Sequence, residues 1–180
     1  MEGKNVYLRI LELSDIPRTQ KWISDPDISE NLGYLPVKSL YQQEQWYKSI
    51  ANDNSRYIFT ICLSQTDELI GIVGLGLINY ISRNASISIF IYDKSYRGMG
   101  YGFEALKLLL KFAFESLNLH KVYARISKSN IQSVNIAKKL GFVQEGILRE
   151  HYYSGGVYHD KISISLLRSE YKKNPELKEF

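Results

Sequence analysis

The chain has 180 residues, a net charge of +4, 44% hydrophobic residues and one cysteine. This length predicts a single domain over residues 1–180, large enough to fold without disulfides or a metal site. Residues 1–13 lack the pattern of a secretory leader and no apolar run approaches about 18 residues, so we expect a cytoplasmic protein with no membrane segment.

The first half of the chain predicts an antiparallel meander preceded by two helices. Strand-like alternation of apolar residues occurs over 4–13, 56–63, 69–79 and 85–92, and helical spacing occurs over 14–25 and 39–50. Asp25 should end the first helix because a proline follows it. Cys62 lies in the apolar stretch YIFTICL and is expected to be a buried structural thiol.

The second half predicts a helix, a strand, a second helix and a hairpin. These are expected over 101–117, 122–127, 130–140, and 142–150 with 157–168, and residues 173–180 are expected to form a loose tail. Together the two halves predict an α/β chain with a mixed sheet and helices on both of its faces. An antiparallel first half of this kind differs from the doubly wound dinucleotide fold.

A glycine-rich turn, Arg97-Gly98-Met99-Gly100-Tyr101-Gly102, stands directly before the third predicted helix. Three glycines at alternate positions let the backbone turn tightly and present its N–H groups. With the positive end of the following helix, these amides favour a phosphate. The alternative is a purely structural entry into the helix.

The charge distribution agrees with a bound polyanion. Residues 94–180 carry 15 Lys and Arg against 8 Asp and Glu, whereas residues 1–93 carry 8 against 11. The basic half therefore begins at the glycine turn, as expected if it receives a nucleotide cofactor. Its lysines are dispersed and form no run, so nucleic acid is not expected as a partner.

Two common phosphate motifs do not fit the turn. A Rossmann turn needs the spacing G-x-G-x-x-G and an acidic residue after the next strand, where this chain has Lys128. A P-loop needs Gly-Lys-Ser/Thr, which Gly102-Phe103-Glu104 does not supply. Both readings are excluded.

The turn matches the Arg/Gln-x-x-Gly-x-Gly/Ala signature of the GNAT N-acetyltransferases, which the chain resembles from about Val6 to Leu167. A second motif of that family resembles Asn130-x-x-Ser133 followed by Lys139-Leu140-Gly141-Phe142. The segments LNLHKVYARI and GILREHYYSGGVYHD look like the branch with ribosomal-protein N-terminal acetyltransferases and spermidine acetyltransferases. The resemblance implies a central mixed sheet of about seven strands.

The resemblance also implies acetyl-CoA as co-substrate and a place for each part of it. The amides from Arg97 through Gly102 would hold the pyrophosphate, and the strand at 89–91 would pair with the pantetheine arm. That strand would splay from the one at 122–127, and a backbone N–H of Phe90 or Ile91 could polarise the thioester carbonyl. Asn130 resembles the asparagine that binds the cofactor arm, although it could equally be a helix N-cap, and both roles can coexist.

The residues expected for acid and base chemistry depart from the family pattern. Ala137 stands where many members have a tyrosine general acid, and Ser86 where many have a glutamate. Ser133 is the remaining catalytic candidate, as a donor to the departing sulfur, or it is a helix serine bonded to its own backbone. The base candidates are Glu145, His151 and Tyr153, or a water molecule, and His120 is expected to be structural.

The acceptor is expected to be a primary amine: a protein N-terminus, a polyamine or another small amine. Asp25, Asp27 and Glu30 could receive a cationic amine, or they form only a solvated face. A second hypothesis is a non-catalytic acyl-CoA-binding module, motivated by Ala137 and Ser86. The tyrosine-rich hairpin near the C-terminus offers a surface for a homodimer.

Overall fold

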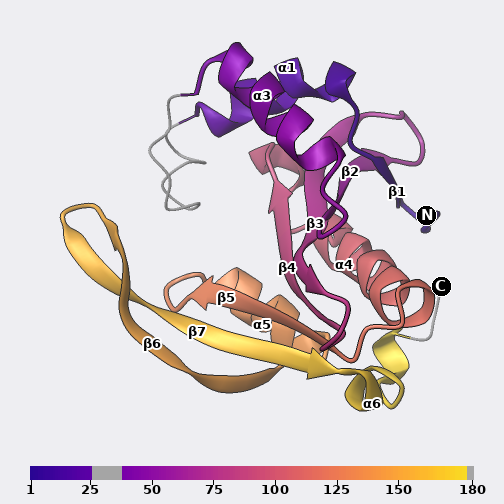
Figure 1. Cartoon of the computed structure of the whole chain (residues 1–180), viewed down its shortest axis with the longest axis vertical. Coiled ribbons are helices and arrows are strands. Elements are labelled where there is room, and N and C mark those ends of the chain that lie inside the picture. The colour runs from indigo at the N-terminus through magenta and orange to yellow at the C-terminus, as the bar shows by residue number, and fades with distance from the viewer. Residues whose placement is uncertain (26–37, 178–180) are drawn as a thin grey trace.

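The structure is a computed structural model that describes residues 1–25 and 38–177, which form one seven-stranded sheet flanked by helices (Figure 1). The strands are β1 Val6–Ile10, β2 Tyr57–Leu63, β3 Leu69–Asn79, β4 Asn84–Ile91, β5 Lys121–Ser127, β6 Val143–Ser154 and β7 Val157–Leu167. The helices are α1 Ile16–Ile23, α3 Leu40–Ala51, α4 Tyr101–Lys111, α5 Ile131–Lys139 and α6 Arg168–Tyr171. None of these described helices is long and apolar enough to span a bilayer.

The sheet has the order β1-β2-β3-β4-β5-β7-β6, and the predicted mixed sheet is confirmed. All neighbouring strands are antiparallel except β4 and β5, which are parallel. That parallel pairing covers only Asn84, Ala85 and Ser86 of β4, opposite Lys121 to Tyr123 of β5. Beyond Ser86 the two strands separate, and Figure 1 shows β5 to β7 turning away from β4.

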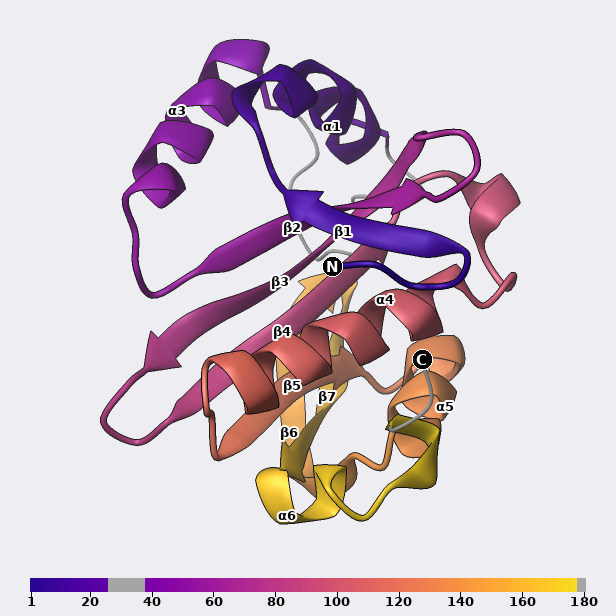
Figure 2. The same cartoon turned by 90° about the vertical axis from the view of Figure 1, so that its right-hand side faces the viewer.

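Helix α4 supplies much of the core because its apolar side chains lie on one side. Ala105, Leu109 and Leu110 are fully buried, and α4 packs on β1, β3 and β4. Figure 2 shows α4 lying across these strands. Cys62 is buried, as predicted, and donates a weak hydrogen bond to Thr60 over 3.8 Å.

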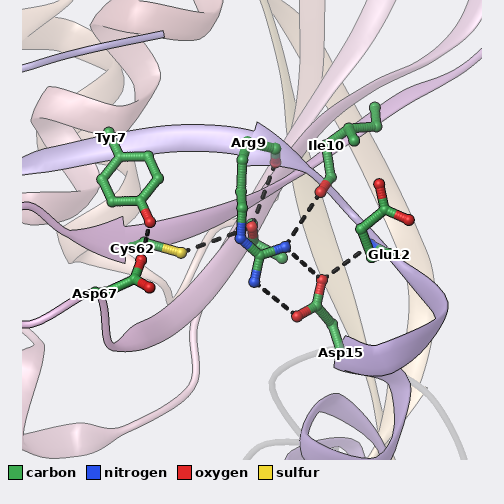
Figure 3. Close-up of polar contacts among 8 residues, drawn as sticks. Tyr7, Arg9, Ile10, Glu12, Asp15, Cys62 and Asp67 are labelled. Atoms are coloured by element: carbon green, nitrogen blue, oxygen red, sulfur yellow. Dashed lines mark hydrogen bonds and ion pairs between the residues drawn. The ribbon is translucent and has the colours of Figure 1, made fainter.

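Helices α1 and α3 pack against each other at the end of the molecule opposite α6 (Figures 1 and 2). Arg9 of β1 binds both carboxylate oxygens of Asp15, at 2.7 and 2.8 Å, and joins the strand to the turn before α1 (Figure 3). Trp22 stacks on Tyr92, the residue after β4, with ring centroids 4.6 Å apart. These contacts fix α1 beside the end of β4.

Three sequence predictions need correction. Strand β6 continues to Ser154 instead of ending at 150, because Gly155 and Gly156 form a two-residue turn with φ of 58° and 84°. The helix expected over 101–117 ends in a π-helical turn over Phe112–Ser116. The tail expected over 173–180 is not loose at Leu177, which is 3% exposed and belongs to the core; residues 178–180 lie outside the described part.

Candidate active site

The glycine turn presents a row of free amides at the start of α4. Gly98 and Gly100 have φ of 78° and 89°, which side-chain-bearing residues rarely adopt, and a Cβ at either position would meet open space. Gly100 is the N-cap of the eleven-residue helix α4. In the described part of the chain, no group accepts a hydrogen bond from the amides of residues 98–103. The turn therefore has the shape and the donors of an anion site.

Arg97 fixes the turn to the end of β4. Its Nε donates to the carbonyl oxygen of Ile91 at 3.0 Å, and its Nη2 donates to that of Tyr92 at 3.1 Å. A side chain held in this way positions the glycine amides relative to the strand. The arginine of the sequence motif thus has a structural part in the site.

On the β5 side, the edge of β4 beyond Ser86 pairs with no strand in the described part of the chain, as the resemblance implies. The amide of Tyr92 donates to Ile70 of β3 at 3.1 Å. Because N–H directions alternate along a strand, the amide of Phe90 also points to β3, whereas those of Ile89 and Ile91 point to the open edge. Of the two amides considered from the sequence, only that of Ile91 faces the opening.

Helix α5 begins opposite this open edge. Asn130 is its N-cap, with Oδ1 accepting from the amide of Ser133 at 3.0 Å, so the predicted capping role is confirmed. The Ser133 hydroxyl makes no hydrogen bond to any described protein group, which leaves it available to a ligand.

Two adjoining cavities lie between β4, β5, α4 and α5. The glycine groove, of about 690 Å³, is lined by Arg97, Gly98, Gly100, Gly102 and Asn130 among others. The inner slot, of about 270 Å³, lies where β4 and β5 have separated. Most of its lining residues are apolar, Ala137 among them, and the others are polar or charged, such as Arg125 and Lys161. Phe90 and Ser133 line both cavities. A ligand with an anionic end and a narrow extended arm fits this arrangement.

Most residues predicted for the site come together here, with a few exceptions. The glycine groove is lined by Phe90, Ile91, Arg97, three glycines, Asn130 and Ser133. Met99 and Tyr101 do not line it: Met99 is 60% exposed, and the Tyr101 ring lies against Tyr96. These two side chains therefore lie outside the groove, whereas their backbone belongs to the glycine turn.

The base candidates from the last strands lie outside both cavities. The Glu145 carboxylate accepts hydrogen bonds from Lys121 and from Ser165. The bond from Lys121 has the larger effect, and together the two hold the pKa of this carboxyl below its ordinary value. His151 is exposed and Tyr153 is 60% exposed.

Ser86 and His120 also lie outside both cavities. Ser86 donates to the carbonyl of Gly76 at 2.9 Å, a contact within the sheet. His120 is exposed, and its backbone joins β5 to neighbouring turns. Asp27 and Glu30 lie outside the described residues.

Sequence reasoning missed Tyr152 and Ser127, which line both cavities. The Tyr152 hydroxyl lies 2.7 Å from Ser127 Oγ, so the two side chains meet at the junction of the slot and the groove. The run His151-Tyr152-Tyr153 indicated that a polar aromatic side chain could enter the site. The sequence pattern did not show which of the three side chains faces inward.

Comparisons with known proteins identify the family. The model of the GNAT acetyltransferase domain matches residues 5–143. The chain is 31% identical to a spermidine N(1)-acetyltransferase of Vibrio cholerae, over 97% of this chain and 99% of that protein. It is 32% identical to a putative ribosomal N-acetyltransferase of Bacillus subtilis, over 58% of this chain and 56% of that protein.

A solved structure gives the same result for the fold. The spermidine N-acetyltransferase of Vibrio cholerae in complex with CoA and spermine has a TM-score of 0.89 and 30% identity, over 95% of this chain and all of that one. The family match covers most of the chain. The chain therefore belongs to the GNAT family and is an acetyl-CoA-dependent N-acetyltransferase.

Proposed function

We propose that the protein transfers the acetyl group to a primary amine of a polyamine, by direct attack in a ternary complex. The observation that carries the proposal is the likeness to spermidine N-acetyltransferases over nearly the whole chain, including the CoA and spermine complex. A protein N-terminus has weaker support, because the ribosomal relative matches only 58% of the chain. The hypothesis of a non-catalytic acyl-CoA module finds no support among these relatives.

The open edge of β4 supports direct attack. Pantetheine laid along Ile89 and Ile91 would pair with amides that no described strand uses, and the thioester would enter the inner slot. The amide of Ile91 is the proposed donor to the thioester carbonyl. The amine nitrogen then attacks the carbonyl carbon, the C–N bond forms and the C–S bond breaks.

Ser133 is proposed as a hydrogen-bond donor to the departing sulfur. Its hydroxyl faces both cavities from the first turn of α5 and has no described protein partner. The pyrophosphate is proposed to bind the amides from Arg97 through Gly102. Positioning by these groups can supply much of the acceleration.

A CoA-release assay with a panel of acceptors tests the acceptor class. The panel holds spermidine, spermine, a monoamine of similar length and a peptide with a free N-terminus. We expect kcat/KM for a polyamine to exceed that for the peptide at least tenfold. A preference for the peptide would contradict the polyamine proposal, and binding of acetyl-CoA with no turnover on any amine would favour the non-catalytic module.

We also propose that copies of the chain associate through the β6–β7 hairpin. The hairpin exposes large apolar side chains, namely Val143, Ile147, Tyr153, Val157 and Tyr158. A related spermidine N-acetyltransferase from Vibrio cholerae has a dodecameric structure. Apolar exposure of this kind is typical of an interaction surface.

A further inference from the structure

Departure of the CoA thiolate requires a proton, and the position expected to supply it holds Ala137, which cannot donate one. Eight of the described residues line both cavities, and four of these have polar side chains, namely Ser127, Asn130, Ser133 and Tyr152. Tyr152 is the only phenol in this set. Phenols are much stronger acids than aliphatic alcohols or amides, and their ordinary acidity lies closer to that of a thiol.

The Tyr152 side chain is held in place from several sides. Its hydroxyl lies 2.7 Å from Ser127 Oγ, which lies 2.8 Å from Ser129 Oγ. Its ring stacks on His159 of β7, with centroids 5.0 Å apart, and the Lys161 ammonium lies 5.1 Å from the ring centroid. A phenol fixed in this way needs little rearrangement to meet a group in the slot.

The hydroxyl also has a route for its own reprotonation. The oxygens of Tyr152, Ser127 and Ser129 form a chain of hydrogen bonds that ends at Ser129, an exposed residue lining the glycine groove. Either hydroxyl of each pair can donate, so a proton can pass along the chain from solvent.

We propose that Tyr152 is the general acid of the acetyl transfer. This inference rests on the proposed transfer to an amine. As the amine nitrogen bonds to the acetyl carbon, the C–S bond breaks with its electron pair on sulfur. The hydroxyl proton of Tyr152 passes to that sulfur to give the CoA thiol. The amine releases one proton to water, and Tyr152 regains one through Ser127 and Ser129.

Ser133 and Tyr152 then approach the sulfur from different elements, α5 and β6. Ser133 orients the sulfur by a hydrogen bond, and Tyr152 transfers the proton. Because the two act on one step, their substitutions are expected to be less than additive in the free energy of activation.

The test is Tyr152→Phe, which keeps the ring and removes only the hydroxyl. We expect kcat to fall about 100-fold, as for loss of a general acid. The KM for acetyl-CoA should stay within about twofold of that of the unsubstituted protein. The rise in melting temperature on adding CoA should stay within about 1 °C of the rise in the unsubstituted protein. The matched control is Tyr153→Phe, since Tyr153 lies outside both cavities and is 60% exposed.

The same variants are compared on whichever amine of the panel turns over and on the hydrolysis of acetyl-CoA without any amine. Sulfur leaves in both reactions, so the role of Tyr152 is tested even if the polyamine proposal fails. Retention of kcat within twofold in Tyr152→Phe would overturn the inference. So would an equal loss of kcat and of CoA binding, because that result indicates a role in binding.

Discussion

At the residue scale, Asp15 is a carboxylate that is 7% exposed and has several donors around it. Arg9 binds both of its oxygens, and the amide of Glu12 donates to it at 2.9 Å (Figure 3). Burial raises the pKa of Asp15, but the hydrogen bonds from Arg9 and Glu12 and the charge of Arg9 lower it further, so the pKa lies below its ordinary value.

Replacing Asp15 by Asn should lower the free energy of unfolding by about 1–3 kcal/mol at pH 7, the cost of losing charge-assisted hydrogen bonds. Because the folded-state pKa is lowered, this contribution is present above about pH 4 and is lost as the pH falls through the folded-state value. Urea unfolding between pH 2 and 7 checks this: the difference between the two proteins should shrink toward acid.

The control for Asp15 is Lys128→Gln. Lys128 is 60% exposed and lies 3.8 Å from Asp160, so its removal should change the free energy of unfolding by at most about 0.5 kcal/mol. A difference for Asp15→Asn that stays constant with pH would contradict the assigned pKa shift.

Gly100 tests the glycine turn at the same scale. Its φ of 89° is strained for alanine by about 1–2 kcal/mol, so Gly100→Ala should lower the melting temperature by about 2–8 °C. Lost amide contacts to the pyrophosphate should raise the KM for acetyl-CoA about tenfold. Gly146→Ala is the control, because a Cβ there also meets open space but its φ is not positive. An unchanged KM in Gly100→Ala would count against the phosphate site.

At the element scale, Asn130 at the start of α5 caps the helix and is also proposed to bind the cofactor arm, and two substitutions can separate these roles. Asn130→Ala removes the N-cap and should cost about 1 kcal/mol of stability, whereas Asn130→Ser keeps a capping oxygen. Both substitutions should raise the KM for acetyl-CoA if the side-chain carboxamide of Asn130 also binds the cofactor arm. Calorimetry and steady-state kinetics on the pair check this. Recovery of both stability and KM in Asn130→Ser would leave Asn130 with the capping role alone.

The open edge of β4 makes a prediction that uses alternate residues of one strand. Addition of CoA should slow amide hydrogen exchange at Ile89 and Ile91, whose N–H groups face the opening. The amides of Ser88 and Phe90 already pair with β3 and serve as internal controls. Exchange measured by NMR with and without CoA checks this. Slowing at Phe90 without slowing at Ile91 would contradict the proposed pairing with pantetheine.

At the scale of the whole molecule, the β6–β7 hairpin extends from the body and exposes apolar side chains (Figure 1). Replacing Tyr153 and Tyr158 together by Ser should shift the protein toward smaller species in sedimentation velocity. Ile81→Ser is the control, since Ile81 is 96% exposed but lies outside the hairpin. If both variants sediment like the unsubstituted protein, the hairpin is not the surface through which copies associate.

The sequence by itself determined the strand and helix pattern and the half of the site that is proposed to bind the cofactor. Local signals suffice for these features. Alternation of apolar residues predicts strands, and three glycines before an amphipathic helix predict an anion site. Asn130 predicts the start of a helix. Ser133 and the glycines come together as predicted because short turns attach them to neighbouring helices.

Only the tertiary structure decided which side chain of the last strands enters the slot. The β6–β7 pairing is irregular between Leu148 and Tyr152, where Glu150 has a φ of 49°. Two extra residues of β6 stand there, which keeps the alternation of faces, whereas the single extra residue between Gln144 and Gly146 exchanges the faces of the residues that follow it. In the folded protein Tyr152 lines the slot and Tyr153 does not. The separation of β4 from β5 after Ser86 likewise depends on pairing between distant segments, which no local pattern reports.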